Sequence, residues 1–374
     1  LNCRRQRQMC IRDRGEAARE RVERCDRFRR QLLDSGGRIY GVNTGFGRLA
    51  DTVIPAADQA DLQRNLIRSH AVGWGPPLDR AQVRGMTLLR ALSLAHGYSG
   101  VRVAVVDQLL WLLESGLHPW IPSRGSVGAS GDLAPLAHLA LVLTGEGHFL
   151  DESGERVEAG PVYEGIGRQV LELEAKEGLA LINGTQMMNS LGLVAVGRAL
   201  SLVRFATVAA ALALEALEGS VQPCGAAYHQ LRPHAGIADV ATGVRRLLAG
   251  SGVVAGHRDC ARVQDPYSVR CLPQVIGATL DVARGARDVF LTEAGSVTDN
   301  PVLLPDEGEV VTGGHFHGQP LALQLDFLYQ AVAELADIAE RRIALLLGGN
   351  GGRLPRFLAG RPGLESGLMI AQYL

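Results

Sequence analysis

The chain has 374 residues, of which 47% are apolar, and its 38 Lys+Arg against 39 Asp+Glu leave a net charge of −1. This balance argues against nucleic acid or an anionic membrane as the main partner, because both need a basic surface. No uninterrupted apolar run reaches the roughly 20 residues of a bilayer-spanning helix. The six cysteines form no C-x-x-C pair. These features predict a globular protein of the reducing cytoplasm.

Only one of the basic residues is a lysine, Lys176. A Walker phosphate-binding loop needs Gly-Lys-Ser/Thr, but Glu177 follows this lysine, so P-loop nucleotide chemistry is excluded. Enzymes that use pyridoxal phosphate need a lysine that forms a Schiff base in a suitable pocket. The single candidate lies in the charged run EAKE. We therefore expect no pyridoxal phosphate and an electrophile from another source.

Most of the chain has the spacing of amphipathic helices, predicted at residues 17–33, 57–70, 79–94 and 101–113. Two longer helices are predicted over 184–218 and from Gln319-Pro320 to about residue 348. In the second, apolar residues recur every three or four positions, as in helices that pack together, at Leu321, Leu325, Leu328, Val332 and Leu335. Strand signals are confined to hairpins at 148–157 and 302–312. The pattern predicts an all-α fold with a long helix bundle and a few short hairpins.

Both ends differ from the rest of the chain. Residues 1–14 are rich in arginine and lack periodicity, and we expect them to be foreign to the fold or disordered. The last residues, 367–374, are apolar and uncapped, which indicates that the chain is truncated. We expect an N-terminal domain at 15–184 and a central helical bundle domain at 185–374, incomplete at its C-terminus.

The run at 125–136 (GSVGASGDLAPL) is the densest local anomaly. One interpretation is a glycine-rich turn in which Ser130 is the N-cap of a helix at 133–143. The other is chemical: the amide nitrogen of Gly131 could attack the carbonyl of Ala129 and close a five-membered ring. Loss of two waters, one of them from Ser130, would then leave an exposed methylidene. Glycine suits this position because a side chain would block the compressed backbone, and the next helix N-terminus would favour negative charge on the ring.

Within that run, residues 128–136 (GASGDLAPL) resemble the signature of the aromatic amino acid ammonia-lyase family, which includes the histidine and phenylalanine ammonia-lyases. Four more runs resemble family blocks in the family's order: 40–47 (YGVNTGFG), 176–185 (KEGLALINGT), 264–270 (QDPYSVR) and 299–301 (DNP). The resemblance extends from about residue 15 to the end. It implies a fumarase/aspartase-like helical fold and a homotetramer with active sites shared between chains. It also implies the prosthetic group 4-methylidene-imidazol-5-one (MIO), formed from Ala129, Ser130 and Gly131 without any metal.

The resemblance also implies roles for individual residues. Tyr40 corresponds to the base that removes the β-proton, and Tyr267 to the second catalytic tyrosine. A phenol with an ordinary pKa near ~10 serves as a base only where the site stabilises its anion. Arg270 corresponds to the group that grips the substrate carboxylate, a task suited to a planar guanidinium. The remaining substrate-binding positions correspond to Asn183, Gln264 and Phe316. An amide at such a position is, in proteins generally, more often a satisfied structural group.

His70 occupies the position where the family tunes its aromatic pocket, and a histidine there resembles histidine and tyrosine ammonia-lyases. The alternative is a helix-terminal histidine that interacts with the helix dipole. Gln186 also resembles the histidine enzymes. We therefore expect conversion of L-histidine to urocanate, with tyrosine or phenylalanine ammonia-lyase and 2,3-aminomutase as alternatives.

His315 and His317 flank Phe316, but this spacing is too weak a signal for a metal site. His315 replaces the asparagine of the family's GGNFHG block, which changes the local hydrogen bonding. In histidine lyases the glutamate that reads the imidazole lies in a further C-terminal region, so the substrate stays open. The non-enzyme alternative is an inactive helical scaffold or fragment. A fumarase or aspartase is disfavoured, since the chain contains no Gly-Ser-Ser-x-Met-Pro block.

Overall fold

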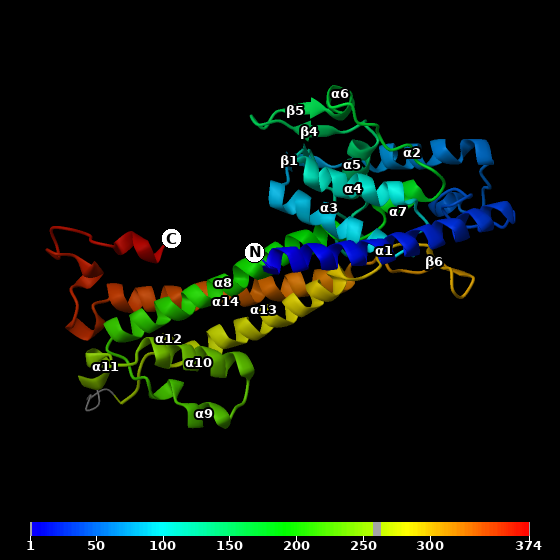
Figure 1. Cartoon of the computed structure of the whole chain (residues 1–374). Helices are drawn as coiled ribbons and strands as arrows, with labels where there is room; N and C mark the ends of the chain where they lie inside the picture. The colour runs from blue at the N-terminus through cyan, green and yellow to red at the C-terminus, as the bar shows by residue number, and fades with distance from the viewer. Residues whose placement is uncertain (1, 257–262, 374) are drawn as a thin grey trace. The chain divides into compact units, whose positions relative to one another are not determined.

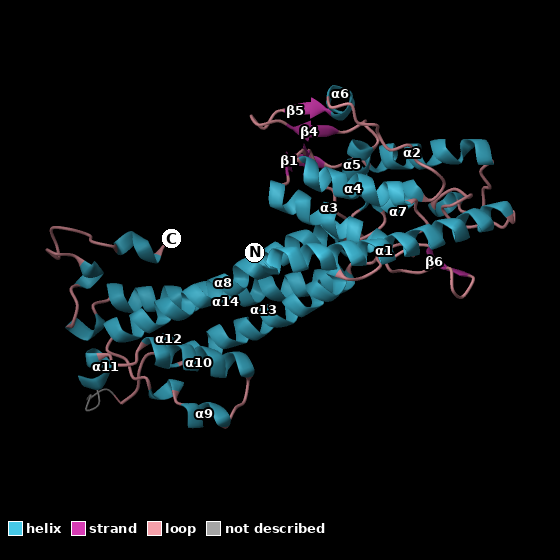
Figure 2. Ribbon diagram, in the orientation of Figure 1, coloured by secondary structure: helices cyan, strands magenta, loops and turns pink. Residues whose placement is uncertain are grey.

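The computed structural model describes residues 2–256 and 263–373, with side chains from residue 15 onward. The described residues are mostly helical and form three small antiparallel sheets (Figure 1; Figure 2). The predicted all-α class is confirmed. Two compact units divide the chain: unit 1 is Leu1–Val194 with Val289–Ala322, and unit 2 is Ala195–Asp288 with Leu323–Leu374.

Unit 1 begins with the four helices that the amphipathic spacing predicts. Asp79 fixes the start of one of them with a capping box, in which its side chain accepts from the backbone of Gln82 and the Gln82 side chain accepts from the backbone of Asp79. The helices are α1 (Asn2–Asp34), α2 (Gln59–His70), α3 (Arg80–Ala95), α4 (Val103–Ser115), α5 (Leu133–Leu143), α6 (Ala159–Gly165) and α7 (Glu177–Ile182), with 3-10 turns η1 (Gly47–Leu49), η2 (Ala56–Asp58) and η3 (Gly128–Ser130).

The backbone of residues 2–14 is helical and continuous with the rest of α1. The sequence indicated no periodic element there, so the helix begins earlier than expected. That these residues are foreign to the fold stays a prediction.

The core of unit 1 surrounds α5, whose residues are almost all buried. Leu136, Ala137 and Leu143 have no exposed surface and pack with apolar side chains of α2, α3, α4 and α7. Because α5 begins directly after residues 129–131, this packing anchors one end of the glycine-rich run in the core.

The small sheets join segments that are distant in the sequence. Strand β4 (His148–Leu150) pairs with β2 (His118–Pro119) and β5 (Arg156–Glu158), and β6 (Val302–Leu304) pairs with β7 (Glu309–Val311). The two predicted hairpins are therefore confirmed. The pair of β1 (Trp74–Pro77) with β3 (Pro122–Arg124) was not predicted, because the prolines of both strands conceal the strand pattern. This pair holds the chain after His70 beside the chain that leads into the glycine-rich run.

Three long helices belong to both units: α8 (Gln186–Ala216), α13 (Leu272–Ala294) and α14 (Gln319–Leu347). The sequence predicts α8 and α14 but not α13, in which Gly277 and Gly285 interrupt the apolar pattern. Packing requires one of these glycines, since a Cβ on Gly277 would lie 2.4 Å from the Cα of Ile237. The predicted boundary at 184/185 differs from the observed division, because these continuous helices hide the point where one unit ends.

Unit 2 contains the short helices α9 (Ala226–Gln230), α10 (Ala235–Leu247), α11 (Gly252–Gly256) and α12 (Tyr267–Arg270), with 3-10 turns η4 (Gln222–Cys224), η5 (Asn350–Gly352), η6 (Arg356–Leu358) and η7 (Met369–Gln372). Its core joins α8, α10, α13 and α14, for example through Leu214, Val244, Ile276 and Leu335. Of the apolar seam predicted along α14, Leu321, Leu328 and Leu335 are buried, whereas Leu325 and Val332 are half-buried.

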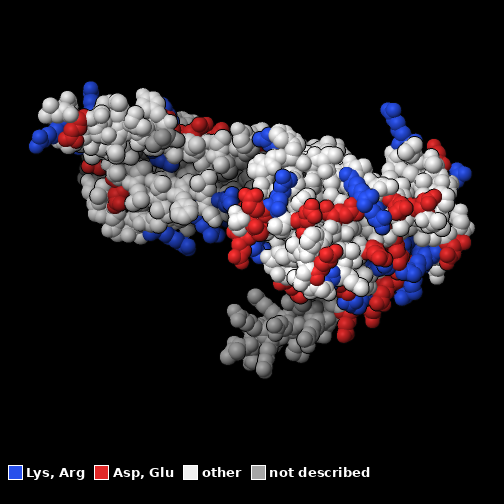
Figure 3. Space-filling model, turned by 90° about the horizontal axis from the view of Figure 1, so that it is seen from above, with Lys and Arg blue, Asp and Glu red and all other residues white. Residues whose placement is uncertain are grey.

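One stretch of the described chain, Glu177–Ala216, is long and apolar enough to cross a membrane by length and composition, which the sequence did not indicate. It consists of α7 and α8 with a break between Ile182 and Gln186, and Arg198 and Arg204 are exposed on α8. Helices of soluble cores meet the same criterion, so this stretch carries little weight. Figure 3 shows mixed acidic and basic side chains on unit 1 and few charges on the visible face of unit 2.

Candidate active site

The three residues of the predicted ring lie in a compact turn. Residues Gly128–Ser130 form η3, and Gly131 follows with φ of 105°, a conformation that favours glycine. The Gly131 amide donates to the carbonyl of Gly128 at 2.9 Å, and the Gly131 carbonyl accepts from the amide of Val127 at 3.1 Å. Backbone hydrogen bonds thus fold residues 127–131 back on themselves.

Two other segments hold this turn from outside. The amide of Gly318 donates to the carbonyl of Ala129 at 2.8 Å, and the amide of Asp132 donates to the carbonyl of Gly184 at 2.9 Å. A Cβ on Gly131 would lie only 3.3 Å from the carbonyl oxygen of Phe316. The structure therefore brings Phe316 to the ring-forming turn, and it leaves room there for glycine but little for a side chain.

Asp132 is a buried carboxylate at this turn that the sequence analysis missed. One of its oxygens accepts from the Ser126 hydroxyl at 2.6 Å, and the other accepts from the Met188 amide at 2.8 Å. Burial raises its pKa to about 6, although these hydrogen bonds oppose the shift. Its position directly between Gly131 and an apolar helix was the signal that could have identified it.

Tyr40 lies in a loop that is shaped by its own side chains. Asn43 accepts from the Ile39 amide at 2.8 Å and donates to the Gly37 carbonyl at 2.7 Å. The Tyr40 hydroxyl accepts from the Gly47 amide at 3.3 Å. Gly41 has φ of 65°, and a Cβ there would lie 2.3 Å from the side chain of Leu179. The loop is thus pressed against α7, with Tyr40 half-buried at the edge of the unit 1 core.

Asn183 ends α7, and its side-chain orientation follows from its partner. Its Nδ2 donates at 2.9 Å to the carbonyl oxygen of Asn300, which can only accept, so Oδ1 remains as the acceptor of this amide. The Asn183 carbonyl accepts from Arg90 at 2.9 Å. Asn183 is therefore partly a structural group and still presents one acceptor.

A layer of buried polar groups supports Asn183, and the sequence analysis missed most of it. Arg90 is fully buried and also donates to Gln186 at 2.9 Å, while Gln186 donates to Thr298 at 2.6 Å. Gln186, which the sequence associated with substrate choice, is thus engaged in this layer. Burial lowers the pKa of Arg90 to about 10. Lys176 and Asp299 form an ion pair at 2.8 Å with neither side chain exposed.

His70 is the last residue of α2, and its tautomer can be assigned. Its Nδ1 lies 2.8 Å from the carbonyl oxygen of Leu66. Because this oxygen can only accept, Nδ1 carries the proton, and in the neutral ring Nε2 presents a lone pair. The contact agrees with the predicted alternative of a helix-terminal histidine, and it leaves Nε2 as an acceptor for another group.

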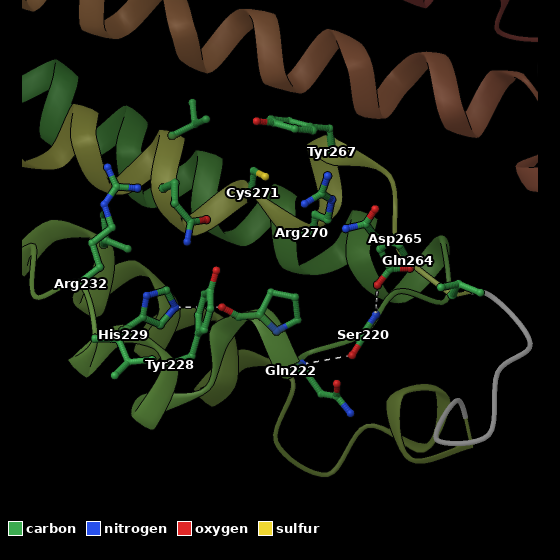
Figure 4. Close-up of a pocket in the computed structure, with 16 residues that line it drawn as sticks. Ser220, Gln222, Tyr228, His229, Arg232, Gln264, Asp265, Tyr267, Arg270 and Cys271 are labelled. Atoms are coloured by element: carbon green, nitrogen blue, oxygen red, sulfur yellow. Dashed lines mark hydrogen bonds between the residues drawn. The ribbon is translucent and has the colours of Figure 1, made fainter.

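The other predicted residues lie in unit 2, where Gln264, Tyr267 and Arg270 line a cavity of about 830 Å³ (Figure 4). The guanidinium carbon of Arg270 lies 4.8 Å from the centre of the Tyr267 ring, so these two side chains lie side by side on α12. Within the described residues, Arg270 Nε and Gln274 Oε1 are buried and have no hydrogen-bond partner. Buried polar atoms without partners are rare in proteins and mark this cavity as a candidate polar binding site.

His315 and His317 show no sign of metal ligation. No group of three or more His, Cys, Asp and Glu in the part of the chain that is described could hold a metal ion. His317 Nδ1 instead accepts from the amide of Gln319 at 3.3 Å, at the start of α14. The predicted site residues thus fall into two groups: Tyr40, His70, Ala129, Ser130, Gly131, Asn183 and Phe316 in unit 1, and Gln264, Tyr267 and Arg270 in unit 2.

Comparison with known proteins shows which family the chain resembles. The family model described as aromatic amino acid lyase matches residues 7–374. A histidine ammonia-lyase of Gloeobacter violaceus is 49% identical over 358 residues, which cover 96% of this chain and 70% of that protein.

Two solved structures are also similar. The histidine ammonia-lyase from Trypanosoma cruzi has a TM-score of 0.84 and 39% identity, covering 95% of this chain and 66% of that one. A tyrosine aminomutase from Streptomyces globisporus has a TM-score of 0.86 and 37% identity, covering 95% and 71%. Fold and comparisons together define a helical carbon–nitrogen lyase. The chain belongs to the aromatic amino acid lyase family, as its five ordered sequence runs predicted.

Proposed function

We propose that the protein eliminates ammonia from L-histidine to give urocanate. The observation that carries the proposal is the enclosure of Ala129, Ser130 and Gly131 between Gly184 and the segment Phe316–Gly318, beside the buried Asp132. This turn is the only source of an electrophile that the sequence analysis identified. The 49% identity to a histidine ammonia-lyase supports histidine as the substrate.

The prosthetic group in this proposal is MIO, formed from Ala129, Ser130 and Gly131. The residues fit it, because Gly131 has a conformation and surroundings that favour glycine and the turn is closed by hydrogen bonds at both ends. When formed, this ring supplies the electrophile that an amino acid substrate lacks. Asp132, with its raised pKa, could accept or return a proton at the turn near neutral pH. We expect that neither a metal nor pyridoxal phosphate is needed.

The predicted site residues would bind the substrate and move its protons. Tyr40 would remove the β-proton through its hydroxyl oxygen, and Tyr267 would be the second catalytic tyrosine. Arg270 would hold the carboxylate, since its guanidinium offers two parallel donors. Phe316 would pack against the prosthetic ring. The amides Asn183 and Gln264 would orient the carboxylate or the amine, and Oδ1 of Asn183 suits the ammonium because it is an acceptor.

His70 would read the side chain of the substrate. Its Nε2 presents a lone pair, so it can accept from the N–H of an imidazole or the O–H of a phenol. A phenyl ring offers no such donor, and a buried acceptor left without one is costly. This preference supports histidine, with tyrosine as the second candidate.

The proposed assembly is a homotetramer whose chains share active sites, and its location is the cytoplasm. One face of α8 supports association, because Leu202, Phe205, Val208 and Leu212 are exposed there at helical spacing. Continuous exposed apolar surface of this kind usually marks a protein interface.

A second candidate function is isomerisation of the amino acid, as in a 2,3-aminomutase. The similarity to a tyrosine aminomutase, with a TM-score of 0.86, favours it over an unrelated activity. Phenylalanine or tyrosine ammonia-lyase activity would use the same residues. An inactive scaffold is the non-enzyme alternative, and it predicts an unmodified turn.

The test is turnover by the full-length product of the gene with L-histidine, L-tyrosine and L-phenylalanine. We expect the fastest reaction with histidine, seen as the ultraviolet absorbance of urocanate, and no β-amino acid among the products. Ser130→Ala is the control and should lose activity by several orders of magnitude while remaining folded. A faster reaction with another substrate, a β-amino acid product, or activity of Ser130→Ala within about tenfold of wild type would contradict the proposal.

A further inference from the structure

Helix α5, which follows the turn of residues 129–131, carries a histidine to which no role has been assigned above. His138 lies on α5, and its side chain is 9% exposed. Its Nε2 lies 3.1 Å from the backbone amide of Gly73, which follows His70 closely in the chain. An amide can only donate, so Nε2 of His138 must be deprotonated and act as the acceptor. His138 thus anchors the backbone just beyond the residue that is proposed to read the substrate.

The surroundings of His138 keep it in the form that can accept. Burial, and to a smaller extent the neighbouring His148, lower its pKa to about 4. The Trp120 ring meets the His138 ring edge-on at 5.5 Å and the His148 ring at 6.1 Å. His138 is therefore neutral throughout the physiological pH range, and its ring orientation is fixed by packing.

The anchored backbone also lies against the start of the ring-forming run. A Cβ on Gly73 would lie 3.0 Å from His138 Nε2 and 3.2 Å from the carbonyl oxygen of Arg124, and a Cβ on Gly125 would lie 3.2 Å from the Cα of Gly73. Trp74 pairs with Arg124 in the β1–β3 sheet. Residues 73 and 74 are thus held between His138 on one side and residues 124 and 125 on the other.

His70 is fixed from both directions as a result. On its N-terminal side the Leu66 carbonyl holds its Nδ1 at 2.8 Å, and on its C-terminal side the chain is fixed at Gly73 by His138. The helix that carries His138 is the helix that begins directly after Ser130 and Gly131. One rigid element therefore sets both the position of the ring-forming turn and the exit of the chain from His70.

We infer that His138 is a positioning residue for substrate selection, which orients His70 relative to the ring-forming turn through the Gly73 amide. This inference rests on the proposed function, because it assigns to His70 the reading of the substrate side chain. It predicts that loss of the acceptor at position 138 weakens the preference for histidine more than it slows the chemical step.

The experiment compares three variants of the full-length product. His138→Phe removes the acceptor but keeps an aromatic ring against Trp120, and His138→Gln keeps an acceptor. His148→Phe is the matched control, since it makes the same change at a second histidine that packs edge-on against Trp120, and His148 has no hydrogen bond to Gly73. Peptide mass of residues 129–131 and thermal unfolding verify that each variant forms the ring and folds.

The first readout is hydrogen–deuterium exchange of the peptide that contains Gly73, which needs no substrate. We expect exchange about tenfold faster in His138→Phe, and close to wild type in His148→Phe and His138→Gln. Equal exchange in His138→Phe and wild type would overturn the anchoring, whatever the enzyme's substrate.

The second readout is kcat and KM for histidine and phenylalanine. In His138→Phe we expect KM for histidine to rise about tenfold while kcat changes less than about threefold, with rescue in His138→Gln. In a His70→Ala background the same change should have no further effect on KM. The inference would be overturned if His138→Phe raised KM for histidine by the same factor in the His70→Ala background as in the wild type. It would also be overturned if His148→Phe raised KM for histidine as much as His138→Phe does. A wild-type enzyme that prefers phenylalanine would instead contradict the proposed function itself.

Discussion

His70 and His138 are each held in a single tautomer by a backbone atom that can only accept or only donate. The Leu66 carbonyl makes Nδ1 of His70 a donor, and the Gly73 amide makes Nε2 of His138 an acceptor. The side chain of Asn183 is oriented in the same way by the Asn300 carbonyl. Hydrogen bonds to the backbone therefore define which groups of the site can meet a substrate, before any substrate is present.

At His70 we predict that replacement by phenylalanine changes substrate choice. The wild type should prefer histidine or tyrosine over phenylalanine, because Nε2 would lack a donor beside a phenyl ring at a cost of about 1–3 kcal/mol. In His70→Phe the ratio of kcat/KM for histidine to that for phenylalanine should fall about tenfold to a hundredfold. Steady-state kinetics with both amino acids decides this. An unchanged ranking would show that His70 does not read the side chain.

At Arg270 we predict a large loss on replacement by lysine, although the charge is kept. Lysine is a point charge and cannot grip a carboxylate through two parallel hydrogen bonds. The loss in kcat/KM should correspond to about 2–4 kcal/mol. Arg232→Lys is the matched control, since Arg232 lines the same cavity and has no assigned role. Equal kinetics in the two variants would indicate that Arg270 does not hold the substrate.

At the scale of elements, the sequence predicted the helices and strands in which the spacing of apolar residues is uninterrupted. The helices α2, α3, α4, α8 and α14 and both hairpins follow from spacing, Gly and Pro. The elements that were not predicted include α13, in which Gly277 packs closely on Ile237, and the proline-containing β1–β3 pair. Both are formed by contacts between distant parts of the chain, which local spacing does not contain.

The candidate site, too, could be predicted only in part, because local spacing does not show which distant residues meet. The resemblance supplied the residues expected to touch the substrate, and their roles stay predictions. The structure places the backbone of Phe316 at the turn of residues 129–131 and the Tyr267 ring beside Arg270. The supporting groups Asp132 and Arg90 were missed. Neither belongs to a pattern of spacing, and their importance is visible only from burial and from partners far along the chain.

Removing one charge of the buried ion pair between Lys176 and Asp299 tests whether this pair stabilises the folded chain. Both side chains are fully buried at 2.8 Å. Asp299→Asn leaves the lysine without a counter-charge and should lower the free energy of unfolding by about 3–5 kcal/mol. The control is Asp107→Asn, which removes an exposed partner of Arg19 and should cost less than about 1 kcal/mol. Denaturant unfolding measures both, and equal losses would refute the special role of the buried pair.

At the scale of the whole molecule, substitutions on the exposed apolar face of α8 can test whether the protein assembles through this face. Phe205 and Leu212 are 72% and 64% exposed on this helix. A glutamate at either position would place a charge in the proposed interface. We predict that Phe205→Glu or Leu212→Glu lowers the molar mass in light scattering after gel filtration. Ile166→Glu, in unit 1, is the control and should leave it unchanged. An undisturbed mass in the α8 variants would place the interface elsewhere.

The central claim is that the chain itself converts Ala129, Ser130 and Gly131 into the electrophile of an ammonia-lyase. The most direct measurement is the mass of the proteolytic peptide that contains these residues, in wild type and in Ser130→Ala. Because ring formation removes two waters, we predict a wild-type peptide about 36 Da lighter than its sequence, and an Ser130→Ala peptide without that deficit. A wild-type peptide of unmodified mass would contradict the claim.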